Sequence, residues 1–319
     1  MKTPKTPVLA LLTAVITVGA LASCSTEATS SADGATTVSV DTAAGPVEVP
    51  QNPQRVVALD NTSLETLRAF GVEPVALPKP IMPYEGFEDW IADEAILDVG
   101  THREPNLEIV NEAEPDLIIG GYRFAEYTDE LGRIAPTLDI APSDDAEGGY
   151  VEALKRQTVA LGAIFDREDQ AADIVSALDE AETDAADRTT GQSVFLSVVS
   201  GGRIDNGAGR IGRIIEPLNL RDVFAGEAGD VHGDSGLAPE AVAAADPEWM
   251  IVLDRDAAAG EPGAAPAKSV IDAQEAFART TFASENQIVY LDPYFYTRES
   301  IQAYTETYEQ LADAFANAS

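Results

Sequence analysis

The chain has 319 residues, of which 55 are acidic and 20 are basic, so its formal net charge at pH 7 is −35. A surface with this charge repels nucleic acid and anionic lipid headgroups, which excludes both as expected binding partners. The length after an N-terminal leader is sufficient for two lobes of ordinary size.

The leader is a basic and then apolar segment at the start of the chain. Lys2 and Lys5 precede an apolar stretch from Val8 to Ala20, and "LASC" ends at Cys24. This pattern predicts a signal peptide over residues 1–23 that is too short for a permanent membrane span. "LASC" resembles the bacterial lipobox, and Cys24 is the only cysteine, so we expect a lipid such as palmitate there and no disulfide. Residues 24–37 are small and polar and predict a flexible tether.

Residues 38–149 predict an N-terminal α/β lobe. "TTVSV" and "PVEV" indicate a small hairpin, "RVVAL" at 55–59 a buried strand, and "NTSLETLRAFG" a helix that Gly71 closes. "VEPVAL" returns to the sheet, and the segment from Asn106 to Gly120 adds a helix and a further parallel strand. Alternating strands and helices are typical of parallel α/β sheets.

Residues 150–190 predict the segment that links the two lobes. "VEALKRQTVALGAIF" and "QAADIVSALDEAETDAADR" carry apolar residues at helical spacing. We expect one long helix, or a helix with one break near Asp166, that bridges the lobes. Periodicity alone is equally compatible with an outer layer of one lobe.

Residues 191–319 repeat the plan of the first lobe. "SVFLSVV" at 193–199 predicts the first strand, and a glycine-rich loop and a helix through "RIGRIIEPLNL" follow it. "NQIVYLD" predicts another strand, and "ESIQAYTETYEQLADAFANA" a closing amphipathic helix. The expected fold class is therefore α/β, with two Rossmann-like lobes that contain parallel sheets and are bridged by a long α-helix.

A repeated motif occurs once in each half. "EPDLIIGGYR" ends at Arg123 and "DPEWMIVLDR" ends at Arg255, and both extend back to a glutamate, Glu108 or Glu240, seven residues before the proline. Each copy predicts a short helix that stops before proline, followed by a buried strand. Ligands of open α/β sheets bind beyond the carboxyl ends of the strands, so both arginines are expected to face a cleft between the lobes. The alternative is a chance likeness of two ordinary helix–strand units.

Several segments, in their order along the chain, resemble the corresponding segments of one protein family. These segments are "VEVPQNPQRVVALD", "ETLRAFGVEPVALP", "DVGTHREPNLEIVNEAEPDLIIGGYR", "NGAGRIGRIIEPLNL", "GLAPEAVAAADPEWMIVLDR" and "IVYLDP". Together they resemble the substrate-binding lipoproteins of bacterial iron-siderophore ABC transporters, in particular the branch that captures catecholate siderophores.

The resemblance implies a non-enzymatic receptor with no intrinsic cofactor. A ferric siderophore would bind in the cleft between the lobes and pass to an ABC permease dimer with its ATPase. The receptor is expected to be a monomer that is exported and held at the cell membrane by the lipid on Cys24, facing outside the cytoplasm.

The resemblance also implies a basic ligand-binding set, which falls here on Arg103, Arg123, Arg210 and Arg255. The chemistry agrees, because guanidinium groups form charge-assisted hydrogen bonds with the oxygens of an anionic ferric complex. The alternative for each arginine is a surface cation that pairs with one of the many carboxylates.

In some relatives a histidine and a tyrosine complete the coordination of iron when the siderophore offers too few donors. The corresponding residues are His232 and Tyr296, although Thr297 stands where relatives often have the tyrosine. Imidazole and phenolate both suit ferric iron. A loop histidine and a packing tyrosine are the alternatives, and His102 is expected to be structural or to line the rim of the site.

Two glutamates correspond to the family's docking residues for the permease, Glu108 and Glu240. Each begins a predicted helix, one in each lobe. Acidic residues at helix starts are ordinarily explained by the helix dipole, which is the alternative here.

Three other readings compete with the leading one. "GAGRIG" at 207–212 has the spacing of a dinucleotide-binding loop, but it begins eight residues beyond Val199, too far from the strand. "GDSG" at 233–236 resembles the nucleophile loop of trypsin-like proteases, whose all-β fold the parallel α/β pattern contradicts. An envelope hydrolase or dehydrogenase is thus weakly supported. The same fold with haem, a corrinoid or a hydroxamate siderophore as ligand is the closer alternative.

Overall fold

A computed structural model of the protein describes residues 36–42, 45–82, 85–101, 104–227, 235–260 and 262–318. The expected signal peptide, Cys24 and the tether up to residue 35 lie outside the described residues, as do His102, Arg103 and His232. Among the helices in the described ranges, none is both long and apolar enough to cross a membrane.

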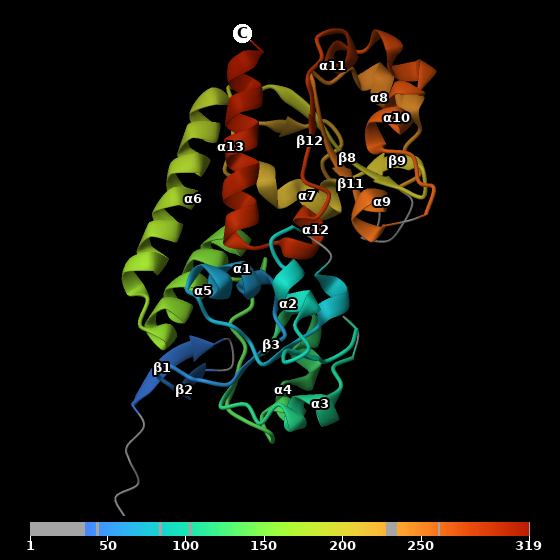
Figure 1. Ribbon diagram of the computed structural model, residues 1–319. Helices are drawn as coiled ribbons and strands as arrows, with labels where there is room; N and C mark the ends of the chain where they lie inside the picture. Colours follow the sequence, from blue (N-terminus) through green and yellow to red (C-terminus); the bar gives the residue numbers. More distant parts are fainter. Residues whose placement is uncertain are drawn as a thin grey trace, which may run out of the picture. The chain divides into compact units, whose positions relative to one another are not determined.

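The N-terminal lobe, which we define as residues 36–148, is built on a parallel sheet with the strand order β5-β4-β3-β6-β7. Figure 1 shows this lobe below the C-terminal one. The expected hairpin precedes this sheet as a separate antiparallel pair. The strands of the lobe are β1 (Thr37–Thr42), β2 (Gly45–Pro50), β3 (Val56–Ala58), β4 (Ala76–Leu77), β5 (Leu97–Asp98), β6 (Leu117–Ile119) and β7 (Thr137–Leu138). Its helices are η1 (Asn61–Ser63), α1 (Leu64–Ala69), η2 (Lys79–Ile81), α2 (Glu88–Ala92), α3 (Leu107–Glu112), η3 (Tyr122–Tyr127) and α4 (Thr128–Leu131).

The C-terminal lobe, residues 191–318, contains a second sheet with the order β10-β8-β11-β12 and an additional strand, β9, on β8. Its strands are β8 (Ser193–Ser200), β9 (Arg203–Asn206), β10 (Arg221–Asp222), β11 (Trp249–Asp254) and β12 (Ile288–Tyr290). Its helices are α7 (Ala208–Ile215), α8 (Pro239–Ala245), α9 (Arg255–Ala259), α10 (Ala267–Asp272), η4 (Glu275–Arg279), α11 (Thr281–Ser284), α12 (Phe295–Arg298) and α13 (Ile301–Asn317).

One strand of the second sheet departs from the expected parallel arrangement. β9 pairs with β8 in the antiparallel sense, where the sequence predicts only a glycine-rich loop. The chain reverses at Gly201 and Gly202, which have φ values of 58° and 68°. The Asp256 carboxylate accepts hydrogen bonds from both glycine N–H groups, at 2.7 and 2.8 Å. A distant carboxylate therefore stabilises this turn, and the local sequence does not show it.

The bridging segment consists of two helices, α5 (Gly149–Phe165) and α6 (Glu168–Arg188). The break lies at Asp166, whose left-handed conformation ends α5, so the second of the two alternatives left open by the sequence is the one found. Both helices bridge the lobes. In α5, Leu154 packs in a core of the C-terminal lobe and Leu161 in a core of the N-terminal lobe, and in α6, Leu178 and Ala171 do the same. Along the second lobe, α6 lies beside α13 (Figure 1).

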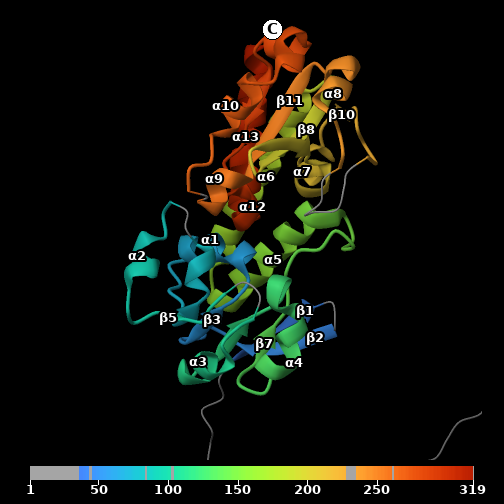
Figure 2. The ribbon, with the colours of Figure 1, turned by 90° about the vertical axis from the view of Figure 1, so that its right-hand side faces the viewer.

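Both sheets are buried on their two faces, as the apolar runs predict. In β8, Val194 and Leu196 face one core whereas Phe195 and Val199 face the other. The two views in Figures 1 and 2 show helices on both sides of this sheet. Each fully buried aliphatic or aromatic side chain contributes about 1.5–3 kcal/mol relative to exposure, so the strands are held mainly by packing. The expected α/β fold class is confirmed.

The repeated acid–proline–acid motif has the same structure in both lobes. Glu114 and Asp246, the acids before the prolines, adopt left-handed conformations with φ values of 46° and 44°. Proline disfavours the right-handed helical conformation in the residue before it, so both helices end there. The acids after the prolines anchor the neighbouring strand: Asp116 accepts from the N–H groups of residues 54 and 55, and Glu248 accepts from the Ser193 N–H.

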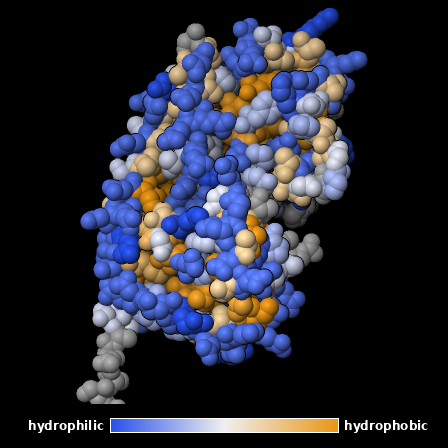
Figure 3. All heavy atoms as spheres, in the orientation of Figure 1, coloured by the Kyte–Doolittle hydropathy of each residue, from blue (hydrophilic) through white to orange (hydrophobic). Residues whose placement is uncertain are grey.

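The face in Figure 3 is covered mostly by hydrophilic residues, with hydrophobic residues visible in patches between them. Among the large hydrophobic residues of the described surface, only Val159 is mostly exposed, at 55%. The described surface is thus mostly polar.

Candidate ligand-binding site

A pocket of about 260 Å³ is lined by residues of both lobes. Its lining comprises Pro80, Ile81 and Arg123 from the N-terminal lobe and Arg255, Ala258, Ala259, Tyr296 and Thr297 from the C-terminal lobe. Arg123 and Arg255, the last residues of the repeated motif, therefore share one cavity. This is the relation that the repeat predicts for two residues placed beyond the carboxyl ends of parallel strands.

Arg123 reaches the pocket through a tight turn after β6. Gly121 has a φ of 86°, and a side chain at this position would collide with the carboxylate of Asp139. Tyr122 also adopts positive φ, at 50°, and the chain then enters η3. The guanidinium carbon of Arg123 lies 5.1 Å from the ring centroid of Tyr122 and 5.7 Å from that of Tyr296, within the range of cation–π attraction.

Arg255 is the first residue of α9 and directly follows β11. The side chain of Asp254 caps this helix by accepting from the Ala257 N–H at 3.1 Å, and its second oxygen accepts from the Ala267 N–H at 2.7 Å. The Arg255 Nη1 donates to the Ser200 hydroxyl at 2.9 Å. Caps of this kind are worth about 1 kcal/mol and fix where the helix begins, so Arg255 has a defined position at the end of the sheet.

Arg210 is the third residue of α7, the helix that the sequence predicted through "RIGRIIEPLNL". The start of α7 is fixed by Gly207, the residue before the helix, which packs directly against β8. The Gly207 N–H donates to the Leu196 carbonyl at 2.9 Å, and a Cβ on Gly207 would lie 2.7 Å from the Ser197 carbonyl carbon. The guanidinium carbon of Arg210 lies 4.6 Å from the centroid of the Tyr296 ring.

Tyr296 is half-buried between the guanidinium groups of Arg123 and Arg210. Burial alone would raise the pKa of its phenol, but hydrogen bonding and positive charge from Arg210 and Arg123 outweigh burial and lower the pKa below the ordinary tyrosine value. The phenolate, a hard oxygen donor, is thus more accessible here than on an ordinary tyrosine.

The charge balance of the pocket differs from that of the surface. Within the described part of the chain, neither Arg123 nor Arg255 forms an ion pair with a carboxylate, whereas Arg68, Arg188, Arg213 and Arg298 all do. Arg123 and Arg255 face one cavity, so their guanidinium groups can bind an anion that has oxygen atoms on its surface. Across the described ranges, no three His, Cys, Asp or Glu side chains gather as a possible metal site.

The sequence did not indicate the pocket residues Pro80 and Ile81, and it treated Thr297 only as a mismatch. Pro80 and Ile81 lie in η2, which begins two residues after β4 ends at Leu77. Their position after a parallel strand was the available signal, because the carboxyl ends of such strands share one edge of the sheet. Thr297 lines the pocket beside Tyr296.

Glu108 and Glu240 are both exposed in the first turns of α3 and α8. The side chain of Asn106 caps α3 by accepting from the Glu108 N–H at 3.1 Å, and Pro239 opens α8. The exposure permits contact with a partner, and the helix dipole also favours an acid at each position. A docking role for these residues stays a prediction.

Similarity to known proteins gives the class to which this chain belongs. The profile of the periplasmic binding protein family matches residues 56–295, so the chain is a member of that family. Its members are extracytoplasmic proteins that bind substrates.

Among individual relatives, the petrobactin-binding protein YclQ of Bacillus subtilis is 28% identical over 320 residues, which cover 96% of each chain. The crystal structure of YclQ matches with a TM-score of 0.75 at 25% identity, over 88% of this chain and 99% of that chain. The ferric-anguibactin-binding protein FatB of Vibrio anguillarum is 25% identical over 237 residues, which are 72% of this chain and 70% of that protein. The structure of BauB, bound to a complex of two acinetobactin molecules and ferric iron, matches with a TM-score of 0.76 at 25% identity, over 88% of this chain and 99% of that chain.

Proposed function

We propose that this protein is a receptor that binds a ferric siderophore of the catecholate or mixed catecholate and carboxylate class between its lobes and delivers it to an ABC permease. One observation carries the proposal: Arg123 and Arg255, from opposite lobes, share a cavity, and neither is paired with a carboxylate within the described ranges. The relatives support this proposal, because YclQ binds petrobactin, FatB binds ferric anguibactin, and the siderophore-binding protein BauB holds acinetobactin and ferric iron.

The electrostatics of the pocket suit such a ligand. A ferric complex of deprotonated catechols or carboxylates is an anion with oxygen acceptors on its surface. Opposite charges about 4 Å apart attract by about 4 kcal/mol in a partly buried setting. Arg210 adds a third cation through its contact with Tyr296. Arg103, outside the described residues, completes the proposed basic set.

Tyr296 has a separate proposed role. Where a siderophore leaves coordination positions of iron open, the phenolate of Tyr296 would supply one oxygen ligand, because phenolate suits ferric iron. The lowered pKa of Tyr296 makes this deprotonation easier. His232, outside the described residues, is the second proposed ligand for such complexes.

The remaining parts of the proposal concern the place and partners of the receptor. It would be a monomer attached to the membrane by a lipid on Cys24 after removal of the signal peptide, and Glu108 and Glu240 would contact the permease. Mass spectrometry of the protein from its native membrane tests the lipid, because an acylated Cys24 as the first residue is the expected product.

The binding proposal is tested by isothermal titration of the mature protein with ferric catecholate, ferric citrate and ferric hydroxamate complexes. Calorimetry is preferred to fluorescence, because Trp90 and Trp249 are both buried and neither lines the pocket. Arg123→Gln and Arg255→Gln should each weaken ferric catecholate binding by about ten- to a hundredfold, the equivalent of one charge-assisted hydrogen bond of about 1.5–3 kcal/mol.

Arg188→Gln is the matched control, because Arg188 pairs with Asp184 on the surface of α6. Its affinity should equal that of the wild type. Absence of saturable binding to every complex would refute the proposal. Tight hydroxamate binding that survives both pocket substitutions would favour the hydroxamate alternative, since such complexes carry less negative charge.

A further inference from the structure

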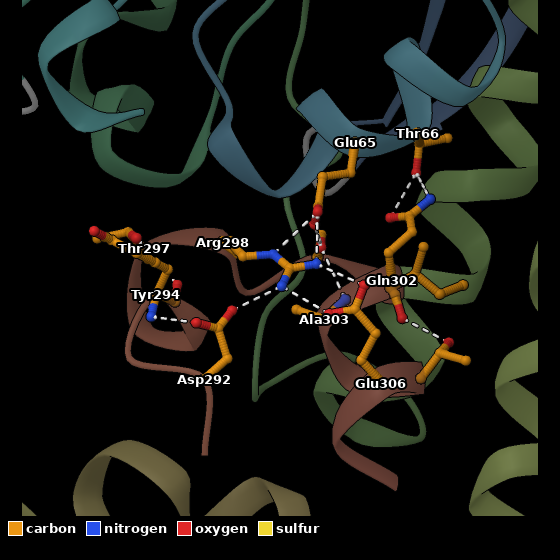
Figure 4. Close-up of polar contacts among 12 residues, drawn as sticks. Glu65, Thr66, Asp292, Tyr294, Thr297, Arg298, Gln302, Ala303 and Glu306 are labelled. Atoms are coloured by element: carbon orange, nitrogen blue, oxygen red, sulfur yellow. Dashed lines mark hydrogen bonds and ion pairs between the residues drawn. The ribbon is translucent and has the colours of Figure 1, made fainter. Parts of the chain in front are cut away.

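The short helix α12 connects the pocket to the contact between the lobes. Tyr296 and Thr297, in the middle of α12, line the pocket, and Arg298, its last residue, points toward the N-terminal lobe (Figure 4). A helix of four residues has no stability of its own. Its position is therefore set by the contacts that its side chains and backbone make.

Arg298 is a buried cation at the centre of an ion-pair network. Its side chain donates from Nε and Nη2 to Glu65 Oε1 at 3.0 and 2.6 Å, and its Nη1 lies 2.8 Å from Asp292 and 2.7 Å from Glu306. Arg298 is only 8% exposed. Burial alone would lower the pKa of its guanidinium, but the surrounding carboxylates raise it above the ordinary value, so the group stays charged.

Glu65 is the one member of this network that comes from the N-terminal lobe, on α1 (Figure 4). Its second carboxylate oxygen accepts a hydrogen bond from Ser300. Beside it, the Asn61 amide donates to the Thr297 carbonyl at 2.6 Å. The N-terminal lobe thus holds both the side chain that ends α12 and the backbone next to it.

The other side of α12 is held by α7. Arg213 Nη1 lies 3.2 Å from Glu299 Oε1, and Arg210, one turn earlier on the same helix, lies over the ring of Tyr296. Residues three apart on a helix share a face. α12 and the residue after it are consequently clamped between α1 of one lobe and α7 of the other.

We propose that Glu65 and Arg298 are positioning residues of the ligand site, which fix α12 so that Tyr296 lies between Arg123 and Arg210. Neither residue lines the pocket, so their effect on a ligand would pass through Tyr296 and Thr297. A buried ion pair is by itself weak evidence for a gain in stability. The contacts around Glu65 and Arg298 indicate instead that this ion pair places the pocket residues Tyr296 and Thr297.

The first test uses the unliganded protein and follows the ionisation of Tyr296 by near-ultraviolet absorbance of the phenolate. The difference between wild type and Tyr296→Phe isolates the signal of this residue. In Glu65→Gln we expect the Tyr296 transition to move to higher pH, because a displaced ring loses the influence of Arg123 and Arg210.

The direction of the shift separates positioning from simple electrostatics. Removal of a negative charge, with no movement of α12, favours the phenolate and would move the transition to lower pH. A shift to lower pH or no shift in Glu65→Gln would overturn the proposal. Glu65→Asp, which keeps the charge on a shorter side chain, should give an intermediate shift to higher pH, and it carries the test if Glu65→Gln does not fold.

Asp179→Asn is the matched control. Asp179 pairs with Lys155 at 2.6 Å between α5 and α6, and Lys155 has a side-chain exposure of 14% against 10% for Arg298. This variant removes an ion pair that does not contact α12, with the Asp179 side chain 54% exposed against 15% for Glu65, so the Tyr296 transition should stay in place even if the protein is less stable. Equal shifts in both variants would show a general loss of structure and contradict a specific role for Glu65.

A second test adds the ligand and rests on the proposed function. Glu65→Gln should lower the affinity for the ferric complex that the wild type binds by on the order of tenfold, the lower end of the usual effect of residues that orient a metal ligand. If no ferric complex binds to the wild type, the proposed function fails, whereas the phenolate titration still decides the positioning role. Unchanged affinity together with a displaced Tyr296 transition would refute the claim that Glu65 affects ligand binding through Tyr296.

Discussion

Arg123 and Arg255 end two copies of one motif, and the two acids that flank its proline have separate structural tasks. The acid before the proline turns the chain out of the helix, as the φ values of Glu114 and Asp246 show. The acid after the proline accepts from N–H groups at the start of the neighbouring strand. The motif is therefore mostly structural, and only its final arginine reaches the pocket.

Glu299 and Asp60 are two buried acids at which we expect a dependence on pH, because burial raises the pKa of both, that of Asp60 to about 7. The Glu299 side chain is buried, and burial, together with the negative charge of Asp60, raises its pKa to about 8. An acid whose pKa is higher in the folded state stabilises the fold fully below its unfolded pKa of about 4.3, and this stabilisation is lost as the pH rises toward 8. The slope for one such group is up to about 1.4 kcal/mol per pH unit.

Glu299→Gln should therefore flatten the decline in the free energy of unfolding between pH 5 and pH 8. The amide can still accept from Arg213, which contacts Oε1 of the native residue. Urea denaturation at several pH values measures the effect, and Glu285→Gln, at an exposed position, is the control that should run parallel to the wild type. A parallel curve for Glu299→Gln as well would contradict the raised pKa.

At the scale of the elements, the start of α7 depends on a close approach between Gly207 and β8. Gly207 has an ordinary φ of −92°, so a side chain there would be resisted by crowding and not by the backbone conformation. The Ser197 backbone cannot move away easily, because it lies in the central part of β8. The position of Arg210 follows from this packing.

Gly207→Ala should destabilise the fold by about 1–3 kcal/mol, the usual cost of overpacking, and should weaken ligand binding by displacing Arg210. Gly212→Ala is a matched control in the same helix, because a Cβ there meets no atom within 4 Å. It should raise the free energy of unfolding by about 0.5–1 kcal/mol, since alanine favours the helix. Equal effects of the two substitutions in urea denaturation would argue against the close approach.

The elements that could be predicted from the sequence are those with a local pattern. The hairpin β1–β2, the strand β8 and the closing helix α13 follow from alternation, an apolar run and helical spacing. The strand β9 could not be predicted, because its turn depends on Asp256, which lies more than fifty residues away. Likewise α12 depends on contacts from two other helices, and nothing in "FYTR" distinguishes it from a loop.

The residues of the candidate site also fall into those that the sequence could indicate and those that it could not. The repeated motif indicated Arg123 and Arg255, because their place after a strand is a local property. The contact of Tyr296 with Arg210 could not be derived, since it joins the start of α7 to a segment near the end of the chain. Glu65 and Arg298 were missed for the same reason: each is an ordinary helical charge until the lobes are in contact.

At the scale of the whole molecule, the net charge of −35 opposes the charge of the proposed ligand. This repulsion acts at long range, and its reach falls from about 30 Å at 0.01 M salt to about 10 Å at 0.1 M. The attraction from the arginines acts only within the pocket. The rate of encounter and the strength of the final complex should therefore respond differently to salt.

We expect the association rate constant of an anionic ferric catecholate to increase as the ionic strength rises from 0.01 to 0.1 M, because salt screens the repulsion first. Stopped-flow mixing measures this rate. Arg123→Gln should show the same trend, since it leaves the long-range charge almost unchanged. A rate that falls with added salt would mean that the pocket, and not the acidic surface, governs the approach of the ligand.

The backbone passes between the lobes through α5 and again through α6, and each helix packs in cores of both lobes. Two rigid crossings resist a wide hinge movement, in addition to the ion pairs around Arg298. The empty and the occupied receptor should then present almost the same exterior to any membrane partner. Such a partner would have difficulty rejecting receptors without cargo, so an excess of unloaded protein should slow uptake by competing for the same docking position.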